Sequence, residues 1–279
     1  MTVLPASARF VVPASTAAAS KLVLFDVMDT IVADPFFRGF HKVAHCIPPR
    51  RHQATHTSSQ AAAALGNRRP ARIGNRARAR LVWADPRFTG GSRVSCTRSA
   101  CAAQDLFDLG SVKELFAIKC QDSFVAFECG EITEAEHFAT YFTDRRPVDG
   151  SRVTEYLRSR YEWLPGMREL CTELQGAGVP MAAMSNYPAP WAPLIEDAVN
   201  LSQLVPWAFV SGEVGLRKPS PEAYTAALEA VGRKADQVIF VDDNPANVDA
   251  ARALGIEAIR FESAAALRPE LQRAGVLPR

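Results

Sequence analysis

Residues 22–36 read LVLFDVMDTIVADPF, an apolar run of strand type that ends in acidic and polar residues around a methionine. Asp26 directly follows the apolar run. A carboxylate at the carboxyl end of a buried strand is costly unless a metal ion, a lysine or a substrate-bound cation meets it. Asp26 is therefore a candidate site residue, and a strand end with solvated polar side chains is the structural alternative.

The second half of the chain alternates between strand and helix patterns. Apolar runs typical of strands cover residues 179–185, 207–212, 237–243 and 256–261. Helical patterns cover residues 164–178, 190–200 and 220–232, a segment that ends at Gly255, and a segment that begins near Ser263. Repeated strand and helix units of this length predict an α/β fold, a Rossmann-like parallel sheet with helices on both faces.

A purely helical pattern separates the first strand from this alternation. Its helices are rich in Phe, and residues 153–163 continue the helical spacing. Two capping boxes open helices here: Ser111 with Glu114, and Thr133 with Glu136. We therefore expect a small helical cap domain, residues 105–162, inserted into a core domain formed by residues 22–40 and 163–279.

The segment 41–104 fits neither domain. It holds four of the five His, and eleven Arg and one Lys against one acid, so its formal charge is +11 and that of the remainder −9. Without apolar periodicity it cannot offset the entropy of ordering, and we expect a disordered basic insertion. The acidic remainder argues against a nucleic-acid surface on the folded part, and an arginine-rich arm for RNA or another anionic partner is the alternative.

A translated intron also explains residues 43–104. Without them the chain reads PFFRGFHK followed directly by DLFDLGSVKEL, which is continuous in pattern. Val codons begin with GT and one Gln codon is CAG, as splice sites require. Sequencing the mature transcript tests this interpretation.

Residues 1–21 are rich in Ser, Ala and Thr and contain no acid, which is typical of an organelle transit peptide or of a disordered tail. The six Cys show no paired spacing, so we expect neither a disulfide framework nor a zinc site. No apolar run approaches the roughly twenty residues that cross a bilayer, and no membrane association is expected.

The predicted strand ends carry polar side chains that would meet at one edge of the sheet, where ligands of open parallel sheets bind. They are Asp26, Ser185 with Asn186, Lys218, and Asp242 with Asp243. In this order they resemble the four motifs of the haloacid dehalogenase-like hydrolase superfamily. The resemblance covers the chain from residue 22 on, apart from 41–104, and CGEITEAEHF (129–138) resembles a recurrent sequence of the small α-helical cap.

This resemblance implies a phosphomonoesterase that uses Mg²⁺ and an aspartyl-phosphate intermediate. It assigns Asp26 as nucleophile, Ser185 and Lys218 as catalytic groups, and Ser185, Asn186 and Lys218 as binding groups for the substrate phosphate. The implied metal ligands are the carboxylates of Asp26, Asp242 and Asp243 and the main-chain oxygen of Met28. An acidic pair at 242 and 243 would burden a dehalogenase, which needs no Mg²⁺.

Met28 departs from the pattern. Phosphatases of the superfamily carry a second Asp two residues after the nucleophile, where an extended chain places it beside the first, and Met cannot move a proton. Asp29 stands where the family often has glycine, and Asp tolerates a positive φ better than most residues. A turn there would bring in Asp29 as the acid. Otherwise water or the substrate supplies the proton, or catalysis is slow.

The motifs FDVMDTIVADPF, SNYP, GLRKPSPEAY and IFVDDNPANV together resemble the chloroplast flavin mononucleotide hydrolases of plants and algae. This resemblance implies hydrolysis of FMN to riboflavin and phosphate in the chloroplast, with the cytoplasm as the alternative location. Aromatic residues of the cap are candidates to stack on the flavin or to form the cap core: Phe116, Phe124, Phe127, Phe138, Tyr141 and Phe142. The alternatives are a phosphatase of a sugar phosphate or nucleotide, and an inactive member that binds flavin or a partner. Oligomeric state is not predicted.

Overall fold

In the computed structural model of the protein, the described residues are 21–36, 106, 107, 109 and 112–278. The predicted amino-terminal segment up to residue 20, the basic insertion 41–104 and the helix start at Ser111 lie outside them. Within the described residues, no helix has both the length and the apolar character that a membrane span requires.

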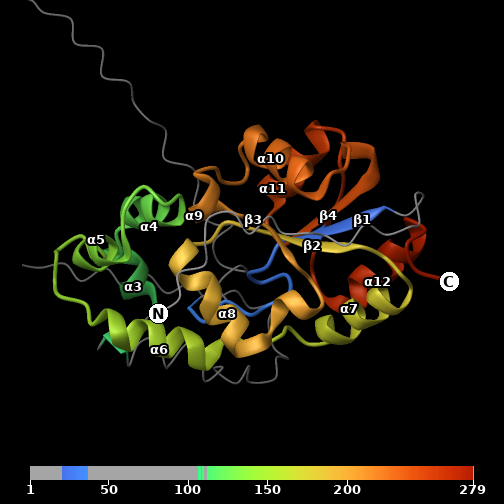
Figure 1. The fold of residues 1–279 in the computed structure, drawn as a ribbon. Coiled ribbons are helices and arrows are strands. Elements are labelled where there is room, and N and C mark those ends of the chain that lie inside the picture. The colour runs from blue at the N-terminus through green and yellow to red at the C-terminus, as the bar shows by residue number, and fades with distance from the viewer. Residues whose placement is uncertain (1–20, 37–105, 108, 110–111, 279) are drawn as a thin grey trace, which may run out of the picture. The chain divides into compact units, whose positions relative to one another are not determined.

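Five parallel strands form the central sheet (Figure 1). They are β1 (Leu22–Phe25), β2 (Met181–Ser185), β3 (Trp207–Val210), β4 (Val238–Asp242) and β5 (Glu257–Arg260). Their spatial order is β3-β2-β1-β4-β5, so the strand order changes direction beside the central strand β1. Such a switch point opens a crevice at the carboxyl ends of the two central strands. The predicted Rossmann-like α/β fold is confirmed.

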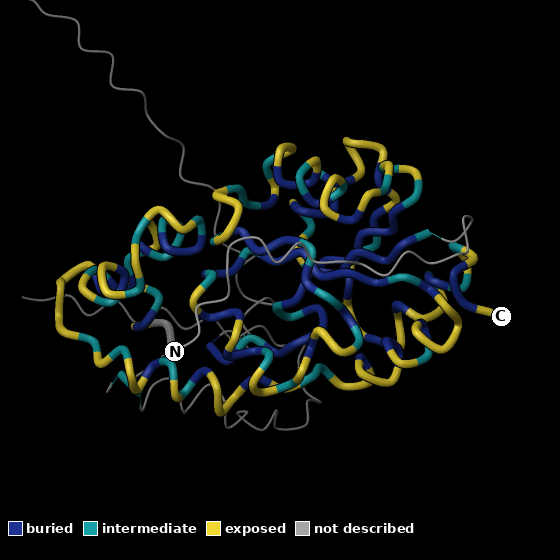
Figure 2. The backbone as a smooth tube through the Cα atoms, viewed as in Figure 1, coloured by how far each residue is buried: buried dark blue, intermediate teal, exposed yellow. Residues whose placement is uncertain are grey.

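Successive residues of each central strand face opposite sides of the sheet, and both sides are buried. Val23, Phe25, Met181, Ala183, Ile239 and Val241 belong to one hydrophobic cluster, and Leu22, Leu24, Ala182, Met184, Val238 and Phe240 to the other. The strands run through the buried interior in Figure 2. Burial on both faces explains why these strands read as continuous apolar runs instead of alternating patterns.

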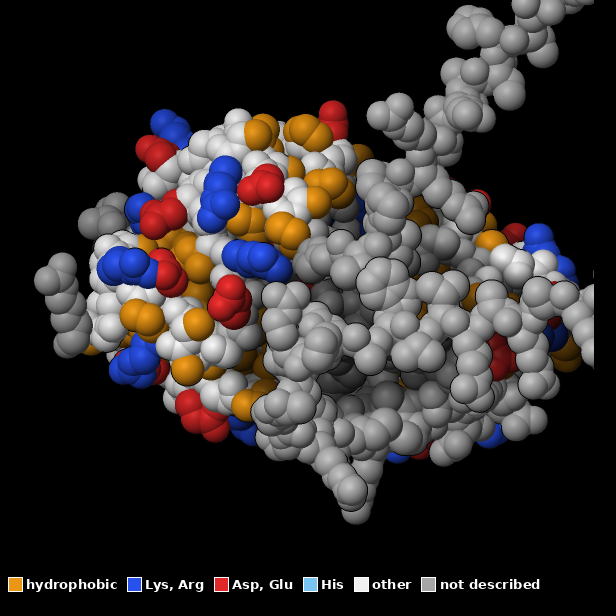
Figure 3. Space-filling model, turned by 180° about the vertical axis from the view of Figure 1, so that it is seen from behind, with side chains coloured by type: hydrophobic (Ala, Val, Ile, Leu, Met, Phe, Trp, Pro, Cys, Tyr) orange, Lys and Arg blue, Asp and Glu red, His pale blue; other side chains and the backbone are white. Residues whose placement is uncertain are grey.

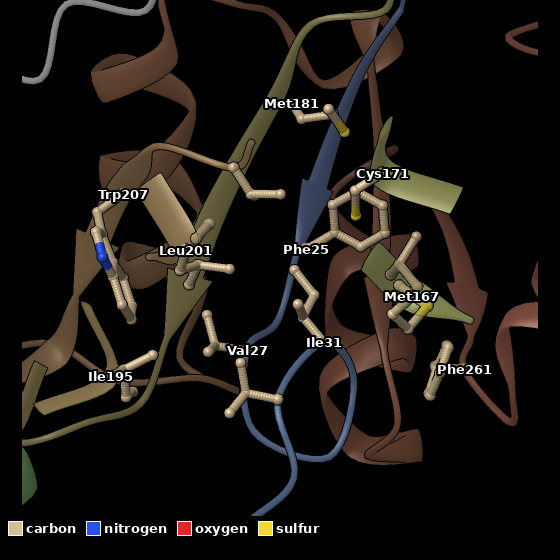
Figure 4. Packing of buried hydrophobic residues seen from close by; sticks show 14 of the residues in the cluster. Phe25, Val27, Ile31, Met167, Cys171, Met181, Ile195, Leu201, Trp207 and Phe261 are labelled. Atoms are coloured by element: carbon tan, nitrogen blue, oxygen red, sulfur yellow. The ribbon is translucent and has the colours of Figure 1, made fainter. Parts of the chain in front are cut away.

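Helices cover both faces of the sheet. Residues of α7 (Met167–Gly176), α8 (Ala192–Val199) and α12 (Ala264–Arg273) join the first cluster, together with the short η1 (Ala189–Trp191) and η2 (Leu201–Gln203). Residues of α10 (Pro221–Val231) and α11 (Pro245–Ala253) join the second. Figure 4 shows that β1, the loop after it, α7 and α8 all contribute to the first cluster, for example through Phe25, Ile31, Cys171 and Ile195.

Several helix ends agree with the sequence signals. The Thr133 hydroxyl accepts the N–H of Glu136 at 3.2 Å while the Glu136 carboxylate accepts the N–H of Thr133 at 2.7 Å, so the predicted capping box is present. Ser263 caps α12 by accepting the N–H of Ala266 at 3.2 Å. Gly255 follows α11 with a φ of 79°, a conformation that glycine adopts without steric cost.

The helical part lies between β1 and α7 along the chain. It contains α3 (Val112–Ile118), α4 (Gln121–Glu128), α5 (Glu134–Ala139) and α6 (Gly150–Arg160). Leu109, Leu115, Tyr141 and Phe142 form a small cluster of their own, whereas Phe127, Val153 and Leu157 join the first cluster of the core. The helical part therefore has its own small core and packs on the sheet domain. Its limits at 105 and 162 stay a prediction.

Charged side chains are mixed over the described part of the face in Figure 3. Lys and Arg side chains lie interspersed with Asp and Glu side chains there. A surface that binds nucleic acid gathers basic side chains on one face, and the mixture on this face differs from that pattern.

The main chains of the helical part and the sheet domain touch at two glycines. A Cβ on Gly130 would lie 2.4 Å from the carbonyl oxygen of Gly212. On the side of the sheet domain, a Cβ on Gly212 would lie 2.4 Å from the main-chain nitrogen of Ala189. Beside this contact, the hydroxyl of Ser211, the first residue of α9 (Ser211–Val214), donates to the carbonyl oxygen of Glu128 at 2.6 Å. The close approach requires residues without side chains.

Gly130→Ala should destabilise the protein more than Gly178→Ala. Both glycines have a positive φ, 71° and 73°, so each alanine pays about 1–2 kcal/mol for the left-handed conformation. Only Gly130 also meets another main chain, which adds about 1–3 kcal/mol of overpacking, since nothing lies within 4 Å of the Cβ position of Gly178. Urea unfolding of both variants measures the difference, and equal losses would contradict the close contact.

Candidate active site

The predicted site residues come together at the carboxyl edge of the sheet. Asp26 follows β1, Ser185 ends β2 and Asp242 ends β4, and these three strands are neighbours. Lys218 reaches the same edge from the loop between α9 and α10. All four side chains are buried.

The Lys218 ammonium lies between two carboxylates. Its Nζ is 2.6 Å from Oδ1 of Asp26 and 2.8 Å from Oδ2 of Asp242, and it donates to the carbonyl oxygen of Met184 at 2.9 Å. Only 1 % of the Lys218 surface is exposed. Three acceptors for three N–H donors satisfy the buried ammonium completely.

Asn186 holds the main chain of Lys218. Its Oδ1 accepts the N–H of Lys218 at 2.8 Å, and its Nδ2 donates to the carbonyl oxygen of Lys218, also at 2.8 Å. Both ends of the amide are thus used to position the lysine. A direct contact between Asn186 and a phosphate stays a prediction.

Three carboxylates form a candidate metal site. Asp26, Asp242 and Asp243 each offer an oxygen, and these oxygens lie within 4.8 Å of one another. Neighbouring groups orient two of them: Asn247 Nδ2 donates to both oxygens of Asp242 at 3.1 and 3.0 Å, and the Thr30 hydroxyl donates to Oδ2 of Asp26 at 3.1 Å. An oxygen-only donor set with supported ligands suits a hard cation such as Mg²⁺.

The charges of the cluster leave room for a further cation. Burial raises the pKa of Asp26 to about 8; Lys218 opposes this shift, and Asp242 and Asp243 add to it. Burial alone would lower the pKa of Lys218, but the ion pairs with Asp242 and Asp26 outweigh it and hold the pKa above its ordinary value. Three carboxylates face one ammonium, so a divalent ion fits the deficit.

Ser185 offers a hydroxyl that no described residue uses. Its Oγ is buried and has no hydrogen-bond partner among the described residues. A buried hydroxyl without a partner costs free energy, and a ligand oxygen at this edge of the sheet would satisfy it.

Met28 and Asp29 lie in the loop that follows β1. Met28 is half-buried and packs against the first hydrophobic cluster. Asp29 has a φ of 54°, as the sequence predicted, and its Oδ1 accepts the N–H of Asp34 at 3.1 Å. The Asp29 carboxylate therefore helps to fold its own loop. Two roles stay predictions: Asp29 as the acid, and the main-chain carbonyl of Met28 as a metal ligand.

One ion pair that the sequence analysis missed connects the helical part to this site. Arg217, which precedes Lys218, lies 2.9 Å through Nε and 2.8 Å through Nη2 from Oε2 of the buried Glu128. Burial raises the pKa of Glu128, and Arg217 opposes this shift. The two residues are 89 positions apart, so no local spacing could have revealed the pair.

Residues 20–255 match the haloacid dehalogenase-like hydrolases, and the chain belongs to this family. The resemblance found in the strand-end motifs is thereby confirmed.

Two curated relatives and one solved structure refine this assignment. A chloroplast flavin mononucleotide hydrolase of Arabidopsis thaliana is 36% identical over 165 residues, which cover 59% of this chain and 67% of the relative. A sesquiterpene phosphatase of Aspergillus oryzae is 30% identical over 166 residues, 58% of this chain and 84% of the relative. A HAD family enzyme of Bacteroides thetaiotaomicron, solved with magnesium and inorganic phosphate, has a TM-score of 0.50 at 16% identity over 88% of this chain and 95% of that one, which shows the fold.

Ser185→Ala should leave the ligand-free protein as stable as the wild type or stabilise it by up to about 1–3 kcal/mol, because the buried hydroxyl has no partner among the described residues. The matched control is Ser211→Ala. The Ser211 hydroxyl donates to Glu128 and accepts the N–H of Tyr187 at 2.8 Å, so its loss should cost about 1–3 kcal/mol. Urea unfolding compares the two, and an equal loss would assign Ser185 a structural hydrogen bond.

Proposed function

We propose that this protein is a Mg²⁺-dependent phosphomonoesterase that hydrolyses FMN to riboflavin and phosphate through an aspartyl-phosphate on Asp26. The Lys218 ammonium between Asp26 and Asp242 carries the proposal. It supplies positive charge next to a carboxylate nucleophile, and the Ser185 hydroxyl at the end of β2 supplies a donor for a phosphate oxygen. The names of both curated relatives, a flavin mononucleotide hydrolase and a phosphatase, agree with the predicted phosphatase class.

Electrostatic repulsion is the main obstacle to this reaction. A carboxylate that approaches a phosphate dianion meets a repulsion on the order of 8 kcal/mol at about 4 Å with an effective dielectric of roughly 20. Lys218 offsets part of it. Asp26, Asp242 and Asp243, and the main-chain oxygen of Met28 as the family resemblance implies, would hold Mg²⁺, which would supply further positive charge.

The proposed reaction has two steps, formation and hydrolysis of the aspartyl-phosphate, in which these side chains have different roles. An oxygen of Asp26 bonds to phosphorus as the ester P–O bond breaks, and the leaving alkoxide takes up a proton. The Ser185 hydroxyl donates to a non-bridging oxygen, and the Lys218 ammonium offsets negative charge beside the phosphoryl group. Water next attacks the phosphorus of the aspartyl-phosphate. The P–O bond to Asp26 breaks, inorganic phosphate leaves, and the carboxylate is restored.

FMN is the substrate that the flavin mononucleotide hydrolase relative favours. The sesquiterpene phosphatase relative keeps other small phosphate esters as the alternative. Of the cap aromatics, Phe127, Tyr141 and Phe142 are only 1–2% exposed and pack in hydrophobic clusters, which favours their role as cap core. An inactive binding protein is the remaining alternative.

A chloroplast location is part of the proposal, because the flavin mononucleotide hydrolase relative is a chloroplast protein. The predicted transit peptide, residues 1–21, would direct the import. The cytoplasm remains the alternative. A fluorescent fusion with and without this segment tests the location.

Phosphate release from FMN should require both the metal and the nucleophile. We expect turnover in Mg²⁺, loss of turnover with a chelator, recovery when Mg²⁺ is added back, and no measurable turnover by Asp26→Asn. Comparison of kcat/KM for FMN with sugar phosphates, nucleotides and isoprenoid phosphates tests the substrate. Similar kcat/KM values for all these esters would exclude FMN as the preferred substrate. Equal phosphate release by the wild type and by Asp26→Asn would favour the inactive alternative.

Asp29→Asn separates a proton donor from a loop-forming residue. If Asp29 protonates the leaving alkoxide, kcat for FMN should fall by about 10² to 10⁴, because Asn has no acidic proton. Asn keeps the oxygen that accepts the N–H of Asp34, so the loop should persist. The exposed Asp144→Asn is the control. An unchanged kcat in Asp29→Asn would assign the proton to water or to the substrate.

A further inference from the structure

One glutamate of the helical part holds both ends of the segment that leads to Lys218. It is Glu128, the last residue of α4, which packs beside α9 (Figure 1). Its carbonyl oxygen accepts the hydroxyl proton of Ser211 at 2.6 Å. Its carboxylate Oε2 lies 2.9 Å from Nε and 2.8 Å from Nη2 of Arg217. We refer to residues 211–217 as the lysine segment, because Lys218 follows it directly.

The middle of the lysine segment is weakly packed. Glu213, Val214 and Gly215 are exposed, and Leu216 is half-buried against the second hydrophobic cluster. Segments with few buried apolar contacts open at a low cost in free energy. The hydrogen bonds at its two ends therefore decide where the segment lies.

The ion pair at the end of the segment is costly to form. Only 6 % of the Glu128 surface is exposed, so its carboxylate gives up most of its hydration. A buried ion pair recovers this cost in part, and apolar side chains of similar volume often stabilise a protein equally well. What the pair adds is a defined arrangement, since the Arg217 guanidinium must lie beside the carboxylate to meet its charge.

Lys218 is thus supported from both parts of the chain. Asn186 of the sheet domain holds the main chain of Lys218 itself through two hydrogen bonds of 2.8 Å. Glu128 of the helical part holds the residue before it, Arg217. The ammonium lies 2.6 Å from Oδ1 of Asp26, and such a bond weakens steeply when its length or angle changes. A shift of the lysine segment would therefore disturb this contact.

We propose that Glu128 is a positioning residue, which places the Lys218 ammonium through Arg217 and makes that placement depend on the docked helical part. The inference rests on the proposed function, in which Lys218 offsets charge beside the phosphoryl group. While the helical part lies on the sheet domain, Glu128 holds the lysine segment at both ends. When the two parts separate, Arg217 loses its partner and Lys218 loses one of its two supports.

A second hydrogen bond between the same two parts provides a matched control. Nε1 of Trp191 in η1 donates to Oε1 of Glu134 in α5 at 2.6 Å. This bond joins the helical part to the sheet domain outside the lysine segment. Glu134→Ala weakens the docking alone, whereas Glu128→Ala also releases Arg217. The Arg217 side chain is 38% exposed, so water can solvate the released guanidinium and the variant should fold.

Turnover should depend on Glu128 far more than on Glu134. We expect Glu128→Ala and Arg217→Met each to lower kcat for FMN by about 10- to 100-fold with KM changed less than about threefold, because small displacements of reacting groups are costly. The double variant should lose no more than either single variant, since the pair acts as a unit. Glu128→Gln keeps an oxygen that accepts from Arg217, so it and Glu134→Ala should stay within about threefold of the wild type.

NMR of the Lys218 ammonium tests the placement without turnover. A buried ammonium with three acceptors exchanges its protons slowly with water, and Lys218→Arg identifies its signal by the loss of that signal. In ligand-free protein with ¹⁵N-labelled lysine, Glu128→Ala should shift this signal and speed the exchange by at least about tenfold. Glu134→Ala, and Glu128→Gln, which removes the charge but keeps the acceptor, should leave the exchange within about twofold.

The outcomes separate this inference from the function on which it rests. Equal losses of kcat in Glu128→Ala and Glu134→Ala overturn the positioning role, because docking alone would explain them. An unchanged Lys218 signal in Glu128→Ala, or an equal change in Glu128→Gln, overturns it as well. If the wild type hydrolyses no phosphate ester while the Lys218 signal responds as expected, the proposed function fails and the placement of Lys218 by Glu128 stands.

Discussion

The contact of the Lys218 ammonium with Asp26 and Asp242 is the interaction on which the rest of the site depends. A buried ammonium held by two carboxylates is stable only while all three are in place, since removal of one partner from a buried pair typically costs about 3–5 kcal/mol. The three residues come from two strands and a distant loop. Correct strand order and the placement of that loop by Asn186 are therefore conditions of the chemistry as well as of the fold.

The topology explains why one loop serves two regions. Because β1 is the central strand beside the switch point, the loop after it begins at the proposed phosphate site and leads toward the helical part. Asp26 stands at one end of this loop, and Asp34 and Phe36 at the other, next to Lys119. The hydrogen bond from the N–H of Asp34 to Asp29 closes the loop between them. The loop thus connects Asp26, the proposed nucleophile, to Asp34 through eight residues of main chain.

The sequence predicted what depends on local periodicity and on strand ends. Apolar runs gave the strands, Thr133 and Ser263 gave helix starts, and the parallel sheet brought Asp26, Ser185 and Asp242 to one edge. Side-chain partners were harder to predict. The pair of hydrogen bonds between the Asn186 amide and the main chain of Lys218 was not predicted, and a contact of Asn186 with phosphate stays a prediction. Glu128 with Arg217, and Lys119 with its aromatic neighbours, depend on how the helical part packs on the core, which no spacing encodes.

In the proposed reaction, Met28 stands where the family resemblance implies an acid, so the rate depends strongly on the basicity of the leaving group. The alkoxide of a ribityl chain is a strong base and departs slowly without a proton, whereas a phenoxide departs with little help. Met28 packs against the hydrophobic cluster and supplies no proton. Any donor must therefore come from the rest of the loop, from water, or from the region where the leaving group binds. A positive charge near the departing oxygen lowers its basicity, so the Lys218 ammonium next to Asp26 would reduce the demand for an acid in the proposed reaction.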